Sequence, residues 1–170
     1  SLTHASIWPQ QLLNALKGDG NPAIILVGSH TPEGRPAEMR HEGYGGWTAE
    51  RFATHFTETA RTGNYRERGS PFLYKGDGGA PVLDFPRYCA DVNGGRTPDV
   101  VLFFLGCNDV FSATDETIES RIETMFTHYE KLVRMVRSAS KDTWIGLMPP
   151  VPSARAMWPW ARSASVAFFA

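Results

Sequence analysis

Three short clusters hold the residues of this chain that could carry chemistry. The first is Ser1-Leu2-Thr3, the second is the glycine-rich segment 41–48 (HEGYGGWT), and the third is Gly106-Cys107-Asn108-Asp109. A serine hydroxyl becomes a nucleophile when a neighbouring base takes its proton. Amide N–H groups can stabilise the negative charge that develops on a carbonyl oxygen under attack. Taken singly, each cluster also has an ordinary structural explanation: a frayed end, a glycine turn and an Asn-Asp turn or cap respectively.

Three apolar runs predict the strands that would position these clusters. They lie at 23–28, 99–106 and 143–148, and each is bounded by glycine or proline. None alternates polar with apolar residues, which favours a parallel sheet covered on both faces. In such a sheet a site forms at the carboxyl ends of the strands, and the Gly-Cys-Asn-Asp cluster directly follows the second run.

Helices are predicted between these runs. Apolar residues at three- and four-residue steps predict helices at 8–16, at 47–56 and from 113 or 114 to about 138, and Thr114-Asp115 can cap the start of the last one. Strands and helices that alternate in this way predict a doubly wound α/β fold. Segment 62–83 is rich in Gly and Pro without a sustained period, and we expect a long loop there.

Composition excludes several classes of protein. The 170 residues are 42% hydrophobic and 21% charged, which is typical of a globular chain with one core. A net charge of −1 offers no basic surface for nucleic acid, and the longest apolar runs, such as 100–105, are too short to cross a membrane. The two cysteines, Cys89 and Cys107, form no CxxC pattern, so we expect neither a disulfide framework nor a structural metal site.

The three clusters, in this order, resemble the sequence blocks of the SGNH hydrolases, also called the GDSL esterase/lipase family. Ser1-Leu2-Thr3 looks like the second half of the first block, Gly-Asp-Ser-Leu-Thr. Gly46 matches the glycine of the second block, and Gly106-Cys107-Asn108-Asp109 matches the third, Gly-x-Asn-Asp. Two further segments, 70–72 (SPF) and 84–88 (DFPRY), are similar to a carbohydrate-esterase-like branch of the family.

The resemblance implies a fold and a domain organisation. It covers residues 1–150 and implies a three-layer α/β/α arrangement around a flavodoxin-like parallel sheet. The family's first strand, which leads into the serine, and its C-terminal catalytic block are not in these residues, so we expect a domain trimmed at both ends. Segment 151–170 shows no amphipathic face or strand pattern and stays unassigned; an out-of-frame ending is one hypothesis for it.

The resemblance also implies an activity. The chain would be a serine esterase that removes small acyl groups, such as acetyl, from a carbohydrate or other small-molecule ester, without cofactor or metal. Ser1 would be the nucleophile, and the Gly46 N–H and the Asn108 amide would form the oxyanion hole. The residues that line the site would be Trp47, Gly106, Cys107 and Asp109, with Asp109 chiefly structural and Trp47 equally able to anchor its helix. Members of the family are often secreted or periplasmic, but nothing in this sequence assigns a compartment.

The sequence departs from the family at the catalytic base. The family takes its base from an Asp-x-x-His block, and no Asp-x-x-His occurs in these 170 residues. His41 is the nearest candidate for a substitute base, whereas His55 and His128 are expected on helix surfaces. An alternative function is therefore a non-catalytic module that binds a glycan or a partner on the same scaffold. A nucleotide-binding reading is weaker because 28–32 (GSHTP) is a poor phosphate loop.

Overall fold

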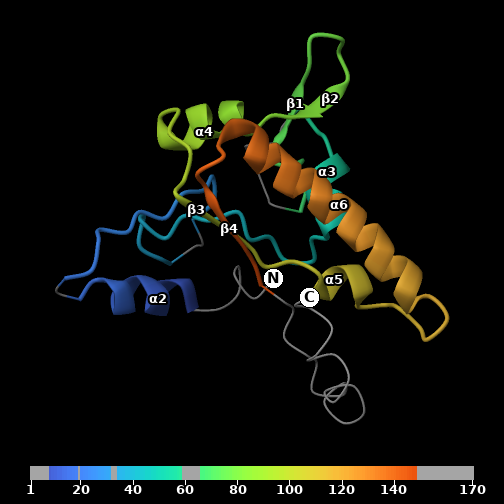
Figure 1. Ribbon diagram of the computed structural model, residues 1–170, viewed down its shortest axis with the longest axis horizontal. Helices are drawn as coiled ribbons and strands as arrows, with labels where there is room; N and C mark the ends of the chain where they lie inside the picture. The colour runs from blue at the N-terminus through green and yellow to red at the C-terminus, as the bar shows by residue number, and fades with distance from the viewer. Residues whose placement is uncertain (1–7, 19, 32–33, 59–65, 149–170) are drawn as a thin grey trace.

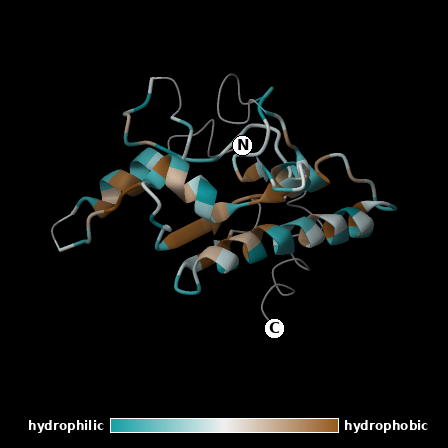
Figure 2. Ribbon diagram, turned by 90° about the horizontal axis from the view of Figure 1, so that it is seen from above, coloured by the Kyte–Doolittle hydropathy of each residue, from teal (hydrophilic) through white to brown (hydrophobic). Residues whose placement is uncertain are grey.

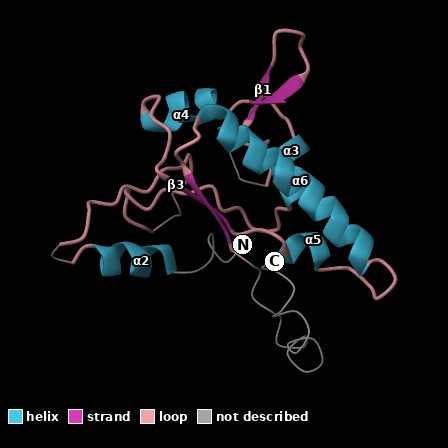
Figure 3. Cartoon of the chain, viewed as in Figure 1, coloured by secondary structure: helices cyan, strands magenta, loops and turns pink. Residues whose placement is uncertain are grey.

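The computed structural model describes residues 8–18, 20–31, 34–58 and 66–148. These residues form a mixed α/β structure with two small sheets, each of two strands (Figure 1). The helices and strands, in chain order, are α2 (Trp8–Leu16), α3 (Ala49–Thr54), β1 (Leu73–Lys75), β2 (Pro81–Leu83), α4 (Phe85–Asn93), β3 (Val100–Phe103), α5 (Cys107–Val110), α6 (Ile118–Ala139) and β4 (Trp144–Leu147). Between α2 and α3 the described chain is loop (Figure 3).

The strands β3 and β4 pair in parallel and confirm two of the three predicted strands. Their register places Val100 opposite Trp144 and Val101 opposite Ile145. The long helix α6 connects them and lies along one side of the pair, with hydrophobic and hydrophilic residues alternating along its length (Figure 2). Parallel strands need such a crossover because the chain must return to the same end of the sheet.

Only one face of this strand pair is covered by the described residues. Val101 and Ile145 pack against the core, in which Leu132 and Val136 of α6 are fully buried. The opposite face is apolar but open: Val100 is 54% exposed, Leu102 50% and Trp144 78%. The expectation of a sheet covered on both faces therefore holds for one face alone within the described part of the chain.

The predicted strand at 23–28 is wrong. The structure has no strand there, and Ile25 is 72% exposed. A run of apolar residues becomes a strand only when another strand accepts its hydrogen bonds, and neither β3 nor β4 pairs with this segment. The chain instead approaches itself just beyond the run, where His30 and His41 form an isolated antiparallel bridge.

The predicted helices are present, with two changes in their bounds. The helix at 8–16 is confirmed, whereas α3 is shorter than 47–56 because Thr48 caps its start by accepting from Arg51 N–H. The long helix begins at Ile118, not near Thr114, and its cap position is Thr117. Thr114 N–H donates to Thr117 Oγ1 at 2.9 Å, so these residues form a turn ahead of the helix.

Four elements were not predicted: the strands β1 and β2, helix α4 and the short helix α5. The antiparallel hairpin β1–β2 lies within the stretch expected to be a loop, and its turn is closed by the Gly76 N–H donating to Ala80 O. Helix α4 follows directly, with Asp84 accepting from Arg87 N–H as its cap and Gly94 in the left-handed conformation at its end. Asp at a cap and Gly at a C-terminus are recognisable helix boundaries.

Aromatic side chains form the centre of the core. Trp47 packs on Phe52 with 4.8 Å between ring centroids, and Phe72 packs on Tyr88 at the same separation. Phe52 also contacts Phe72, so one aromatic cluster joins α3, the β1–β2 hairpin and α4. Within the described residues, no helix combines the length and the apolar character that a membrane crossing requires.

Candidate functional site

The glycine-rich loop and the Gly-Cys-Asn-Asp cluster meet in space, although 60 residues separate them. Asn108 Nδ2 donates to the Trp47 carbonyl oxygen at 2.9 Å. Its neighbour Asp109 accepts from the Ala49 N–H through Oδ1, also at 2.9 Å. These two hydrogen bonds hold segment 46–49 against the start of α5 and bring Gly46 near Asn108. We call this contact between segment 46–49 and residues 106–109 the junction. Ser1, the proposed nucleophile, lies outside the described residues, as does His4.

Gly46 has an exposed backbone in a left-handed conformation. Its φ is +78°, and a Cβ placed there would meet no atom within 4 Å. Glycine is therefore favoured for its backbone conformation, not for lack of room. Gly46 is exposed, and no described residue accepts a hydrogen bond from its N–H.

Asn108 keeps donor capacity after its contact with Trp47. A carboxamide nitrogen carries two hydrogens, and the Trp47 carbonyl takes one of them. That bond also fixes the orientation of the amide. The Trp47 carbonyl oxygen can only accept, so the Asn108 atom that faces it must be the nitrogen. Asn108 is half-buried, so the second hydrogen belongs to an oriented donor at the surface of the junction.

Gly106 and Cys107 shape the start of α5. Gly106 is buried and has a φ of +111°, a conformation that a side chain would strain. Cys107 is a free thiol with an exposed side chain. The sharp turn at Gly106 directs the chain from β3 into α5 and presents Cys107 and Asn108 at the end of the strand.

Asp109 acts as a brace between α5 and α3. Its side chain is buried, and burial raises the pKa of its carboxyl group above the ordinary value. The backbone N–H of Ala49 is the largest influence in the opposite direction, followed by the N–H groups of Asp109 and Gly106 and by the charge of His128. A carboxylate at the first N–H of α3 also interacts favourably with the helix dipole.

Trp47 anchors the junction to the aromatic core. Its side chain is 1% exposed and contacts Tyr44 and Phe52, with the Arg51 guanidinium 4.5 Å from its ring centroid. Of the two roles predicted for it, the described contacts support the anchor. A wall of an open pocket would expose more of the indole.

The histidines are placed differently from expectation. His41 is buried, and its Nδ1 accepts from the Gly43 N–H at 2.9 Å, so the lone pair that a base would use is engaged within its own loop. His55 is half-buried at the end of α3, and its burial, then the charge of Arg51, lower its pKa. The surface position predicted for His128 is wrong: the side chain is 9% exposed and belongs to the buried face of α6.

A cluster of hydrogen-bond donors around the Glu42 carboxylate was not predicted. Glu42 accepts from the backbone N–H of Ser29 at 2.5 Å, from Ser29 Oγ at 3.0 Å, from Tyr44 Oη and from Tyr88 Oη at 2.8 Å. Burial, then the charge of Glu42, raise the pKa of both phenols, which therefore stay protonated and donate. The cluster ties the 28–30 loop and α4 to the segment that leads into Gly46. A Glu within a glycine-rich segment was the available sequence signal, but its partners come from distant parts of the chain.

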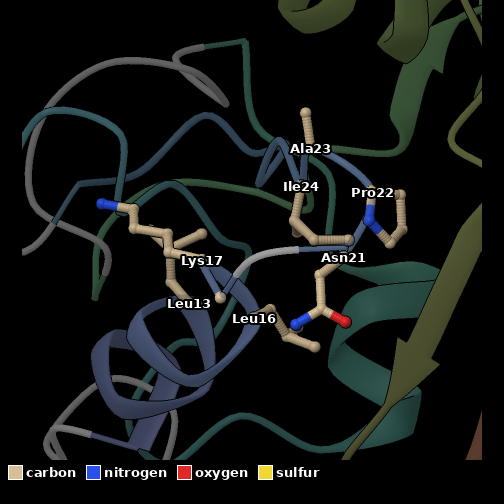
Figure 4. Close-up of a pocket in the computed structure, with 8 residues that line it drawn as sticks. Leu13, Leu16, Lys17, Asn21, Pro22, Ala23 and Ile24 are labelled. Atoms are coloured by element: carbon tan, nitrogen blue, oxygen red, sulfur yellow. The ribbon is translucent and has the colours of Figure 1, made fainter.

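A pocket of about 260 Å³ lies at the end of α2 (Figure 4). Leu13, Leu16 and Lys17 line it from the helix side, and Asn21, Pro22, Ala23 and Ile24 from the loop that follows. None of its lining residues belongs to segment 46–49 or to α5. Across the residues that the structure describes, no group of three or more His, Cys, Asp or Glu side chains is arranged to hold a metal ion.

Comparison of the chain with protein-family models, with curated proteins and with solved structures finds no match. The geometry of the junction and the sequence motifs therefore carry the functional argument alone.

Proposed function

We propose that this chain is a serine hydrolase of the SGNH type that cleaves carboxylic esters, with Ser1 as nucleophile and Gly46 and Asn108 as the oxyanion hole. The observation that carries the proposal is the hydrogen bond between Asn108 Nδ2 and the Trp47 carbonyl. Two motifs that the family places in one site approach each other here, and both retain amide donors. The substrate class that follows is a small acyl ester, such as an acetylated carbohydrate.

The proposed fold is a three-layer, flavodoxin-like sheet. Strands β3 and β4 with the crossover helix α6 would be two of its parallel strands and one of its covering layers. The motif Gly106-Cys107-Asn108-Asp109 then stands at the carboxyl end of β3, where sites in such sheets form.

The proposed chemistry is acyl transfer in two steps. Ser1 Oγ attacks the ester carbonyl and loses its proton to solvent water, the carbonyl oxygen takes the negative charge, and the Gly46 N–H and the second hydrogen of the Asn108 amide donate to it. The tetrahedral intermediate expels the alcohol, which takes up a proton from solvent water, and leaves an acyl-serine; water then hydrolyses the acyl-serine to the carboxylic acid and free Ser1. Asp109 accepts a hydrogen bond from the Ala49 N–H and thereby holds the segment with Gly46 beside α5. No residue of this chain is assigned as the general base.

The alternative is a binding module without turnover. It is favoured by the lack of an Asp-x-x-His sequence and by the engagement of His41 Nδ1 with the Gly43 N–H. Loss of a triad member costs on the order of 10⁴ to 10⁶ in rate, so a chain without the base would bind esters far better than it cleaves them.

A serine-directed fluorophosphonate probe tests the proposal. We expect slow labelling of the chain that Ser1→Ala abolishes, because Ser1 is the hydroxyl whose attack the Gly46 and Asn108 amides assist, and it is slow because no assigned base takes the proton. Asn108→Ala should slow the labelling about a hundredfold or more, which is the usual effect of removing one oxyanion donor. Asn14→Ala is the matched control, since Asn14 is an exposed asparagine on α2, and it should leave the rate unchanged.

Two results would contradict the esterase. Labelling that survives Ser1→Ala would show that another residue reacts. A chain that is never labelled, but that binds an acetylated oligosaccharide, would support the binding module instead.

A further inference from the structure

Two buried polar atoms at the junction of α5 and α6 have no hydrogen-bond partner among the described residues. They are Oδ2 of Asp109 and Nδ1 of His128. Both side chains are 9% exposed, and the two helices that carry them pack against each other. A carboxylate oxygen accepts and an imidazole nitrogen can donate, so the two atoms are chemically complementary. Buried polar groups without a partner are rare in folded proteins, and each needs a physical explanation.

The electrostatics place these groups within each other's influence. The positive charge of His128 lowers the pKa of Asp109, in opposition to the burial that raises it. The other titratable groups around Asp109 are Tyr129 of α6 and Cys107 of α5. Burial raises the pKa of Tyr129 to about 12, so its phenol stays neutral, and its oxygen is occupied as acceptor for the Leu105 N–H. From the side of α3, Asp109 meets the Ala49 backbone N–H.

Packing alone does not explain a histidine at this position. The buried face of α6 is otherwise made of apolar side chains and Tyr129, namely Met125, Leu132, Met135 and Val136. An apolar residue at 128 would continue this face without burying a ring nitrogen. On the buried face of α6, His128 is the residue whose ring can carry the positive charge that a carboxylate such as that of Asp109 attracts.

We propose that His128 is a positioning residue, whose ring attracts the Asp109 carboxylate across the contact between α6 and α5 and thereby steadies the Asn108 amide. Oδ1 of Asp109 binds the Ala49 N–H, and the Trp47 carbonyl two residues earlier receives the Asn108 amide. The chain of contacts therefore runs from α6 through α5 to the Gly46 loop. Its link to catalysis rests on the proposed function, whereas the His128–Asp109 pair itself does not.

Nuclear magnetic resonance titration of the full chain tests the pair. In wild type, the chemical shifts of the Asp109 carboxyl carbon and of the His128 ring should both change at the pH where Asp109 titrates; we call this change the Asp109 step. His128→Gln removes the positive charge, so the Asp109 step should move to higher pH. His55→Gln, which removes a histidine that does not influence Asp109, is the matched control and should leave the step in place.

The side-chain amide of Asn108 reports the positioning role. Its nitrogen and proton resonances should shift with the same midpoint as Asp109 in wild type, and this step should be lost in Asp109→Asn. Adding His128→Gln to Asp109→Asn should cause no further change at Asn108, since the link is already broken. A residue with a purely structural role would not couple these titrations.

The outcomes separate this inference from the esterase. An Asp109 step at the same pH in wild type and His128→Gln overturns the pair, whatever the phosphonate probe does. If His128→Gln does not fold, the absence of an Asp109 step at the His128 ring in wild type overturns it equally. A chain that is never labelled overturns the esterase but leaves the titrations as predicted here.

Discussion

The junction around Asn108 and the outer face of the β3–β4 pair differ in how many partners the rest of the chain supplies to their side chains. At the junction, distant segments supply partners: Asn108 binds Trp47, Asp109 binds Ala49, and the Trp47 indole is fully covered. On the outer face, Val100, Leu102 and Trp144 lie half or more exposed without a described layer over them. The junction therefore has the rigidity that an oriented amide donor needs, whereas that face adds little to stability.

The largest expected difference comes from truncating a leucine in each region. Leu132→Ala removes a fully buried side chain of α6 and should lower the free energy of unfolding by about 2–5 kcal/mol. Leu102→Ala, at a side chain 50% exposed, should cost less than half as much, because less of the side chain leaves water on folding. Urea denaturation of both variants measures the difference. Equal losses would show that the open face is covered in solution.

The next largest effect is expected where the backbone of Gly28 lies close to the backbone of His41. A Cβ at Gly28 would lie 2.4 Å from the His41 backbone nitrogen, so Gly28→Ala should cost about 1–3 kcal/mol of unfolding free energy through overpacking. Gly78→Ala is the control, because a Cβ there meets nothing within 4 Å. A thermal unfolding midpoint unchanged in Gly28→Ala, relative to this control, would contradict the contact between the 28–30 loop and His41.

A smaller effect follows from the raised pKa of Asp109. Because the folded-state pKa lies above the unfolded value of about 3.9, the folded chain holds this proton more tightly. Asp109 thus makes stability fall as pH rises from the unfolded pKa through the folded one, and its carboxylate is a net cost above that window. Asp109→Asn keeps an oxygen for the Ala49 N–H and should remove this slope. Unfolding free energies measured between pH 4 and pH 7 check the sign, and a wild-type stability that rises across the same window by way of Asp109 would contradict it.

The smallest effect is expected on the outer side of α6. Glu130 and Arg134 form an exposed ion pair at 2.7 Å, with both side chains more than half accessible to solvent. Glu130→Gln should leave the thermal midpoint unchanged within error, because water screens such pairs. A clear loss of stability would show that this side of the helix is packed against something.

Local signals in the sequence were enough where an element finds its partners within the chain. The apolar spacing of 8–16 predicted α2, and the run at 99–106 predicted β3, which pairs with β4. The run at 23–28 has the same local character, but no described strand accepts its hydrogen bonds, and it stays a loop. Helix α4 could have been found from Asp84, Pro86 and Gly94, which are ordinary boundary residues.

The candidate site was predictable as motifs but not as contacts. That Gly46 and Asn108 approach each other depends on a hydrogen bond across 60 residues, which no local pattern contains. The burial of His128 had a signal, since it lies three residues after Met125 and four before Leu132 on one helix face. The hydroxyl partners of Glu42 gave no such signal, because Ser29 and Tyr88 come from a loop and a helix that meet only in the folded chain.

A crystal structure of the chain after reaction with a phosphonate ester would test the oxyanion hole most directly. We expect the phosphorus bonded to Ser1 Oγ, with the phosphoryl oxygen about 3 Å from the Gly46 nitrogen and from Asn108 Nδ2. Phosphorus on another side chain, or a phosphoryl oxygen directed away from both amides, would contradict the account.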